Sequence, residues 1–214
     1  MSELFSIQLQ NQQQSRDGVW LDLPTTTEQV QAALRQIGIS SDNPQGLFIS
    51  GYFAEEEKRF AISYNMVLAS NVDELNFLAS RLETLSTGER AELNAALQAP
   101  QSELFSIGRI TDFPENVDYY VHLPDVHGPA QLGDYYLNRS GMVDMPEEWK
   151  GGIDTAQFGR YVAQQEQGAF TQYGYLIKSG DEWQKVHEGQ PVPEEYRVLS
   201  FPAPEVCLLY TSPS

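Results

Sequence analysis

Hydrophobic and polar residues alternate over short stretches at the start of the chain, in the manner of β-strands. LFSIQLQ at residues 4–10 follows this two-residue period, and Trp20 to Leu23 could pair with it. GLFISGYF at residues 46–53 is typical of a third strand. Between them, residues 26–37 place apolar side chains at helical spacing and end at Gly38. The pattern predicts a small α+β unit.

The stretch NVDELNFLASRLETLS, which begins at Asn71, has the apolar spacing of an amphipathic helix. Asn71 can cap the first turn while Glu74, three residues on, reaches back to the Asn71 N–H in a capping box. One helical face then carries Leu75, Leu78, Ala79, Leu82 and Leu85. Ser86 and Glu89 repeat the capping signature. These signals predict a helical segment from about residue 64 to about residue 99.

Beyond Pro100 the pattern becomes mixed again. VDYYVHLP at residues 117–124 resembles a strand, AQLGDYYLN and DTAQFGRYVAQQE resemble helices, and GAFTQYGYLIKSG resembles a strand or hairpin. This region is dense in aromatic residues, most of which we expect in the core.

These three regions predict an α+β chain built from three small units. The expected boundaries give an N-terminal α+β unit over residues 1–62 and a central helical unit over 63–101. A C-terminal α+β unit follows over 102–200, and residues 201–214 form a tail.

The formal net charge of −17 limits the partners that the chain can bind. Nucleic acid and anionic membranes carry the same sign of charge, so direct binding to either is disfavoured and a basic partner is expected. The acidic excess is spread along the chain: acidic and basic residues number 8 and 4 in residues 1–62, 5 and 2 in 63–101, 11 and 5 in 102–180, and 6 and 2 in 181–214. The same distribution would also suit a protein whose charge only maintains solubility.

Catalytic and metal-binding motifs are scarce. The chain has three histidines and one cysteine, and it contains no G-x-S-x-G, H-E-x-x-H, C-x-x-C or phosphate-binding glycine loop. His122, Asp125 and His127 could hold a metal ion in a hydrolase, although a polar turn explains HLPDVH equally simply. We expect no enzyme activity and no cofactor. An acidic adaptor for some other basic protein is a further alternative.

No N-terminal apolar segment of the signal-peptide type occurs, and no apolar run is long enough to span a bilayer. The sequence therefore predicts a soluble, intracellular protein that does not bind membranes.

Several segments together resemble the ArdA family of antirestriction proteins. They are WLDLP at residues 20–24, NVDELNFLASRLETLS, VDYYVHLPDVHGPAQLGDYYLNRSG, IDTAQFGRYVAQQEQGAFTQYGYL and VPEEYRV, in this order over roughly residues 4–200. The terminal VCLLYTSPS, which includes Cys207, departs from the family pattern, so we expect this segment not to belong to the natural protein, whose own C-terminal residues after about residue 204 the sequence does not identify.

The resemblance implies an elongated mimic of B-form DNA with three small domains in a row. Such proteins are carried by mobile genetic elements, form dimers through the last domain, and occupy the DNA-binding groove of type I restriction-modification enzymes at the methyltransferase core. The acids would then stand in for phosphates. The candidate phosphate mimics are Glu55, Glu56, Glu57, Asp73, Glu74, Glu83, Glu89, Glu92, Asp112, Glu115, Asp118, Asp125, Asp134, Asp144, Glu147, Glu148 and Asp154.

The net charge of the chain can also be compared with the charge on a given length of duplex DNA. B-DNA carries about one negative charge per 1.7 Å of axis, so the net charge corresponds to about 29 Å of duplex. A longer bipartite DNA target would be covered only by two copies, which favours a homodimer. The aromatic residues Phe170, Tyr173 and Tyr175 are the candidate dimer contacts.

Overall fold

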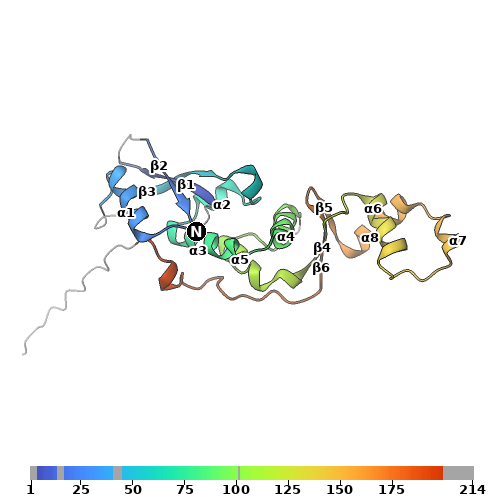
Figure 1. The fold of residues 1–214 in the computed structure, drawn as a ribbon. Helices are drawn as coiled ribbons and strands as arrows, with labels where there is room; N and C mark the ends of the chain where they lie inside the picture. Colours follow the sequence, from blue (N-terminus) through green and yellow to red (C-terminus); the bar gives the residue numbers. More distant parts are fainter. Residues whose placement is uncertain (1–3, 14–16, 41–44, 101, 200–214) are drawn as a thin grey trace, which may run out of the picture.

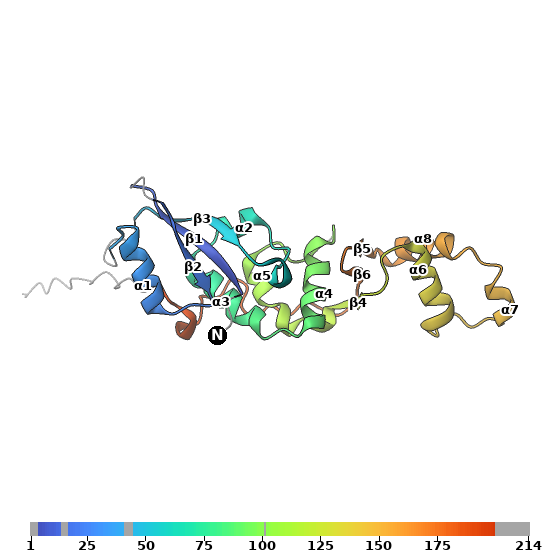
Figure 2. The same cartoon turned by 45° about the horizontal axis from the view of Figure 1, so that its top comes forward.

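The computed structural model describes residues 4–13, 17–40, 45–100 and 102–199 of the chain. Figures 1 and 2 show an elongated molecule with the first sheet and α1 at one end and the helices α6, α7 and α8 at the other. Among the described residues, no helix combines the length and the apolar character needed to cross a bilayer. The predicted tail at 201–214 lies outside the described residues.

The N-terminal unit contains an antiparallel sheet of order β2-β1-β3 and one long helix. Its elements are β1 (Phe5–Asn11), β2 (Val19–Leu23), α1 (Thr27–Gln36) and β3 (Leu47–Phe53). Ile7 in β1 lies opposite Leu21 and Tyr52. Alternate strand residues such as Leu9 and Leu23 are fully buried, because one face of the sheet packs on the core. The predicted strands and helix of this region are confirmed.

The predicted helical segment consists of three helices. After the short η1 (Glu56–Lys58) come α2 (Tyr64–Leu68), α3 (Val72–Glu83) and α4 (Thr87–Gln98). Both capping boxes are present: Asn71 Oδ1 accepts from Glu74 N at 2.9 Å, and Ser86 N donates to Glu89 Oε2 at 2.7 Å. The breaks lie at these caps, since each begins a new helix.

The C-terminal region contains a second antiparallel sheet, of order β4-β6-β5. It is preceded by α5 (Ile107–Thr111) and the short turns η2 (Phe113–Glu115) and η3 (Val117–Tyr119), and its strands are β4 (Tyr120–Leu123), β5 (Ala169–Thr171) and β6 (Gly174–Lys178). The predicted strand and the predicted hairpin are therefore confirmed. The last element, η5 (Glu194–Tyr196), is a single 3-10 turn.

The helices between β4 and β5 project from this sheet and are called the arm below (Figure 1). They are α6 (Pro129–Asp134), the π-helix η4 (Tyr135–Arg139), α7 (Glu147–Lys150) and α8 (Thr155–Glu166). Two glycines allow α6 and α8 to touch. A Cβ on Gly159 would lie 1.8 Å from the Pro129 carbonyl oxygen, and one on Gly133 would lie 1.9 Å from that of Thr155. No side chain larger than hydrogen fits at either position.

Buried hydrophobic side chains form two clusters. The larger one extends from Leu4 through α3 and α4 to Leu104, Phe113 and Val198, so it crosses the predicted boundaries at residues 62 and 101 without a break. The smaller one lies at the base of the arm and contains Val126, Leu132, Tyr136 and Tyr175. The packing thus separates the arm from the rest of the molecule, whereas it does not divide the chain at the predicted boundaries.

Residues 181–199, called the strap below, fall within the predicted C-terminal unit, but no element and no path were predicted for them. The strap runs from β6 back along the molecule toward the first sheet (Figure 1). Its backbone is held by side chains: Gln184 N donates to Asn116 Oδ1 at 2.7 Å, and Tyr196 O accepts from Asn76 Nδ2 at 3.0 Å. Side-chain bonds thus replace a regular hydrogen-bond ladder here.

Candidate functional site

The predicted phosphate mimics divide into three groups by exposure. Those exposed are Glu55, Glu56, Glu74, Asp118, Asp125, Asp144, Glu147, Glu148 and Asp154. Those partly buried are Asp73, Glu83, Glu89, Glu92, Glu115 and Asp134, whereas Asp112 is buried; nothing is described of the Glu57 side chain. The exposed group extends from η1, which follows the first sheet, to α7 on the arm, the end of the molecule opposite α1 (Figure 1).

The Asp112 side chain is buried and binds the backbone of the strap, so it does not face a partner. Its side chain is 0% exposed, and its two oxygens accept from the backbone N–H groups of Val186, His187 and Glu188 at 3.3, 2.6 and 3.2 Å. A buried carboxylate is stable only when it is hydrogen-bonded in this way. We therefore leave Asp112 out of the candidate surface.

Asp73 has a similar role at the other end of the strap. Its Oδ1 accepts from the backbone N–H groups of Val198 and Leu199, both at 2.7 Å. Asp73 is partly buried. Both acids therefore hold the strap, and the sequence alone gave no sign of these bonds because their partners lie more than 70 residues away along the chain.

Glu92 on α4 carries less charge than its neighbours. Burial raises the pKa of the Glu92 carboxyl to about 8, and the charges of Glu89 and Asp118 add to this shift. Its Oε1 is buried and has no hydrogen-bond partner among the residues that the structure describes. By contrast, hydrogen bonds from Ser86 lower the pKa of Glu89. Glu89 is therefore ionised at neutral pH, whereas Glu92 is mostly protonated and is a poor substitute for a phosphate.

Because the pKa of the Glu92 carboxyl is raised in the folded protein, the free energy of unfolding should depend on pH. Between the ordinary pKa of 4.5 and the folded value of about 8, the folded state binds a proton that the unfolded state has lost. The free energy of unfolding should therefore fall as pH rises through this window, and level off above it. Urea unfolding of the wild type and of Glu92→Gln at about pH 5.5 and about pH 8.5 measures this. The variant should become relatively more stable at the higher pH; a constant difference between the two proteins would contradict the burial of Glu92.

Ion pairs reduce the free charge of some predicted acids. The pairs are Glu55 with Lys58, Glu115 with Arg81, Asp134 with Arg139, and Glu147 with Lys150. The Arg81–Glu115 pair is partly buried, while the Glu147 carboxylate in its pair is 81% exposed. Water screens such exposed pairs, so Glu147 remains available to a competing basic group.

The structure also exposes acids that the sequence-based set omitted. They are Asp17, Asp22 and Glu28 in the N-terminal unit and Asp181, Glu182, Glu194 and Glu195 in the strap. The acidic excess of residues 181–214 was the available signal for the strap acids. With these residues, exposed carboxylates lie on the first sheet, the strap and the arm.

Of the three candidate dimer contacts, Tyr175 is a core residue and the other two are partly buried. Tyr175 is 0% exposed and donates through its hydroxyl to Glu166, and Phe170 packs against it with ring centroids 4.8 Å apart. Tyr173 is partly buried. Two apolar side chains of the arm are much more exposed than these three: Met142 is 76% exposed and Trp149 is 67% exposed. Their exposure was not evident from the sequence because neither residue belongs to a long periodic segment.

The three candidate metal ligands do not form a cluster. Within the described ranges, no group of three or more histidine, cysteine, aspartate or glutamate side chains could hold a metal ion. A ring nitrogen of His122 lies 2.7 Å from the Tyr173 carbonyl oxygen, which links β4 to the β5–β6 turn. His127 and Asp125 are exposed in the turn after β4.

Comparison with protein families identifies the family to which the chain belongs. The model of a family described as antirestriction protein (ArdA) matches residues 13–177, which is more than half of the chain. The strap lies beyond the matched residues. No curated protein matches the chain.

Proposed function

Because the chain belongs to the ArdA family of antirestriction proteins, we propose that it inhibits type I restriction-modification enzymes by occupying the groove in which they bind duplex DNA. The observation that carries the proposal is the placement of exposed carboxylates over an elongated molecule, from η1 to α7 (Figures 1 and 2). Under this proposal, these groups contact the lysines and arginines that otherwise bind phosphates.

The mechanism needs no base-specific contact. Phosphate contacts fix a protein on duplex DNA without reading its sequence, so a surface of carboxylates can compete for the same basic groups. Each exposed ion pair contributes only about 0.2 to 1 kcal/mol, and inhibition therefore depends on many acids together. The methyltransferase core is the proposed partner, and the protein itself does not bind nucleic acid. Its proposed role is to protect incoming mobile DNA in the bacterial cytoplasm.

A homodimer is part of the proposal, since the net charge of one chain equals the phosphate charge of less than one turn of duplex DNA. The arm offers the apolar surface for it, because Met142 and Trp149 are among its most exposed side chains. Sedimentation should show a dimer at micromolar concentration that Trp149→Ser weakens. Tyr175→Phe, which changes a buried residue, is the matched control and should leave the association constant unchanged. A monomer under these conditions would contradict this part.

The function is tested by a plasmid-protection assay. Unmodified plasmid is introduced into cells that carry an active type I system, with or without the protein, and into cells that lack the system. The protein should restore the transformation efficiency to that of the cells without restriction. Unchanged restriction in cells that contain the folded protein would overturn the proposal.

A further inference from the structure

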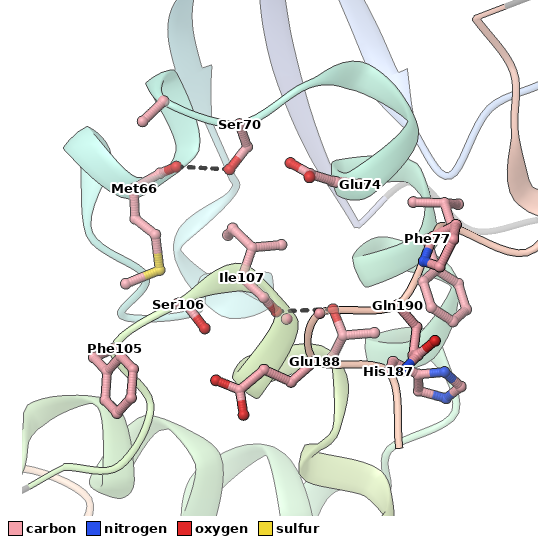
Figure 3. Close-up of a pocket in the computed structure, with 16 residues that line it drawn as sticks. Met66, Ser70, Glu74, Phe77, Phe105, Ser106, Ile107, His187, Glu188 and Gln190 are labelled. Carbon is pink, nitrogen blue, oxygen red and sulfur yellow. Dashed lines mark hydrogen bonds between the residues drawn. The ribbon is translucent and has the colours of Figure 1, made fainter. Parts of the chain in front are cut away.

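A cavity of about 660 Å³ opens between the α2–α3 connection, α5 and the strap (Figure 3). Ile107 and Phe77 are buried and form its apolar wall, together with the partly buried Met66. Phe105 lies at its edge and is 63% exposed. The cavity is therefore large enough and apolar enough to take up a long side chain.

The charged groups of this cavity are acidic. Glu74 and Glu188 line it, and within the described part of the chain no lysine or arginine does so. Glu188 is already engaged, because Arg109 Nε donates to its Oε1 at 3.1 Å and Lys185 Nζ lies 3.5 Å from its Oε2. Glu74 accepts a hydrogen bond from Asn71 N through Oε2, and within the described part of the chain it forms no ion pair. Figure 3 shows its carboxylate directed toward the hollow.

We infer that this cavity receives an arginine side chain of the inhibited enzyme, an inference that rests on the proposed function. The aliphatic stem of an arginine would pack on Met66 and Ile107, and its guanidinium would meet the Glu74 carboxylate. Phe105 lies at the opposite side of the cavity from Glu74 (Figure 3), and one face of its ring is already covered by the chain's own Arg109, whose guanidinium carbon is 4.6 Å from the ring centroid. A guanidinium suits the Glu74 carboxylate better than an ammonium, because it is more weakly hydrated and its planar set of N–H groups matches a carboxylate.

The inference is tested without the enzyme, by NMR titration with N-acetyl-arginine amide. The neutral N-acetyl-citrulline amide has nearly the same shape and is the control ligand. The arginine compound should shift the amide signals of Ser70, Ser106 and Gly108 saturably, because these residues line the cavity. The signal of Gly151 on the arm should stay unchanged. We expect binding of the citrulline compound to be about tenfold weaker, because its ureido group still donates hydrogen bonds but no longer carries the positive charge that strengthens them.

The variant Glu74→Gln tests the carboxylate itself. Glutamine retains the capping box, so the helix start should be preserved. The variant should bind the arginine compound about as weakly as the citrulline compound. Equal binding of both compounds to the wild type, or an absence of saturable shifts, would overturn the inference. Neither result would touch the proposed function, which fails only if the plasmid-protection assay fails.

Discussion

Replacing Gly159 by alanine should disrupt the arm. The added Cβ would lie 1.8 Å from the Pro129 carbonyl oxygen and 2.8 Å from Gly133 N, so α6 and α8 must separate. The cluster at the base of the arm has only a few buried side chains to oppose this, and we expect a loss of about 3 kcal/mol or more in local stability. Amide hydrogen exchange in α6 and α8 should become faster by about 100-fold.

Gly151→Ala is the matched control for this change. Gly151 follows α7 on the same arm, and a Cβ there would have no atom of the described residues within 4 Å. The amide hydrogen exchange rates of Gly151→Ala in α6 and α8 should equal those of the wild type. If amide hydrogen exchange in α8 of Gly159→Ala is as slow as in the wild type, the close contact between α6 and α8 is not required for the stability of the arm.

Replacing Asp112 by asparagine should have the second large effect. The amide presents an NH₂ group to at least one of the three backbone N–H donors of Val186, His187 and Glu188, and it removes the charge that strengthens the remaining bonds. Hydrogen bonds to charged groups contribute about 1.5 to 3 kcal/mol each, so we expect the free energy of unfolding to fall by about 3 kcal/mol or more. Chemical denaturation measures it.

Asp125→Asn makes the same chemical change at an exposed position. It should alter the free energy of unfolding by less than about 0.5 kcal/mol. If the two variants are equally stable, Asp112 does not hold the strap.

Local patterns predicted much of the fold. The capping boxes at Asn71 and Ser86 involve residues three positions apart, and alternation along β1 reflects one buried face, so both can be read from short windows. The strap could not be predicted in this way. It has no periodicity, and its position depends on Asp112 and Asp73, whose bonds join distant parts of the chain.

The same physical limit applies to the candidate surface. An acidic residue in a sequence indicates exposure, and this holds for Asp118, Asp144 and Glu148. It fails for Asp112, whose burial depends on the strap, and in part for Glu92, which is partly buried on α4. Composition therefore gives the total charge correctly, whereas only the tertiary structure shows which carboxylates can reach a partner.

The central claim is that exposed acids act together as substitutes for phosphates, and competition with labelled duplex DNA for a type I methyltransferase core tests it most directly. The series starts from the wild type, continues with Asp125→Asn, and ends with neutralisation of Asp118, Asp125, Asp144 and Glu148 together. The single change should weaken competition by less than about fivefold and the combined change by about tenfold or more, with smaller differences at high salt. Complete loss from the single change in a folded protein, or full competition by the fourfold variant, would contradict the account.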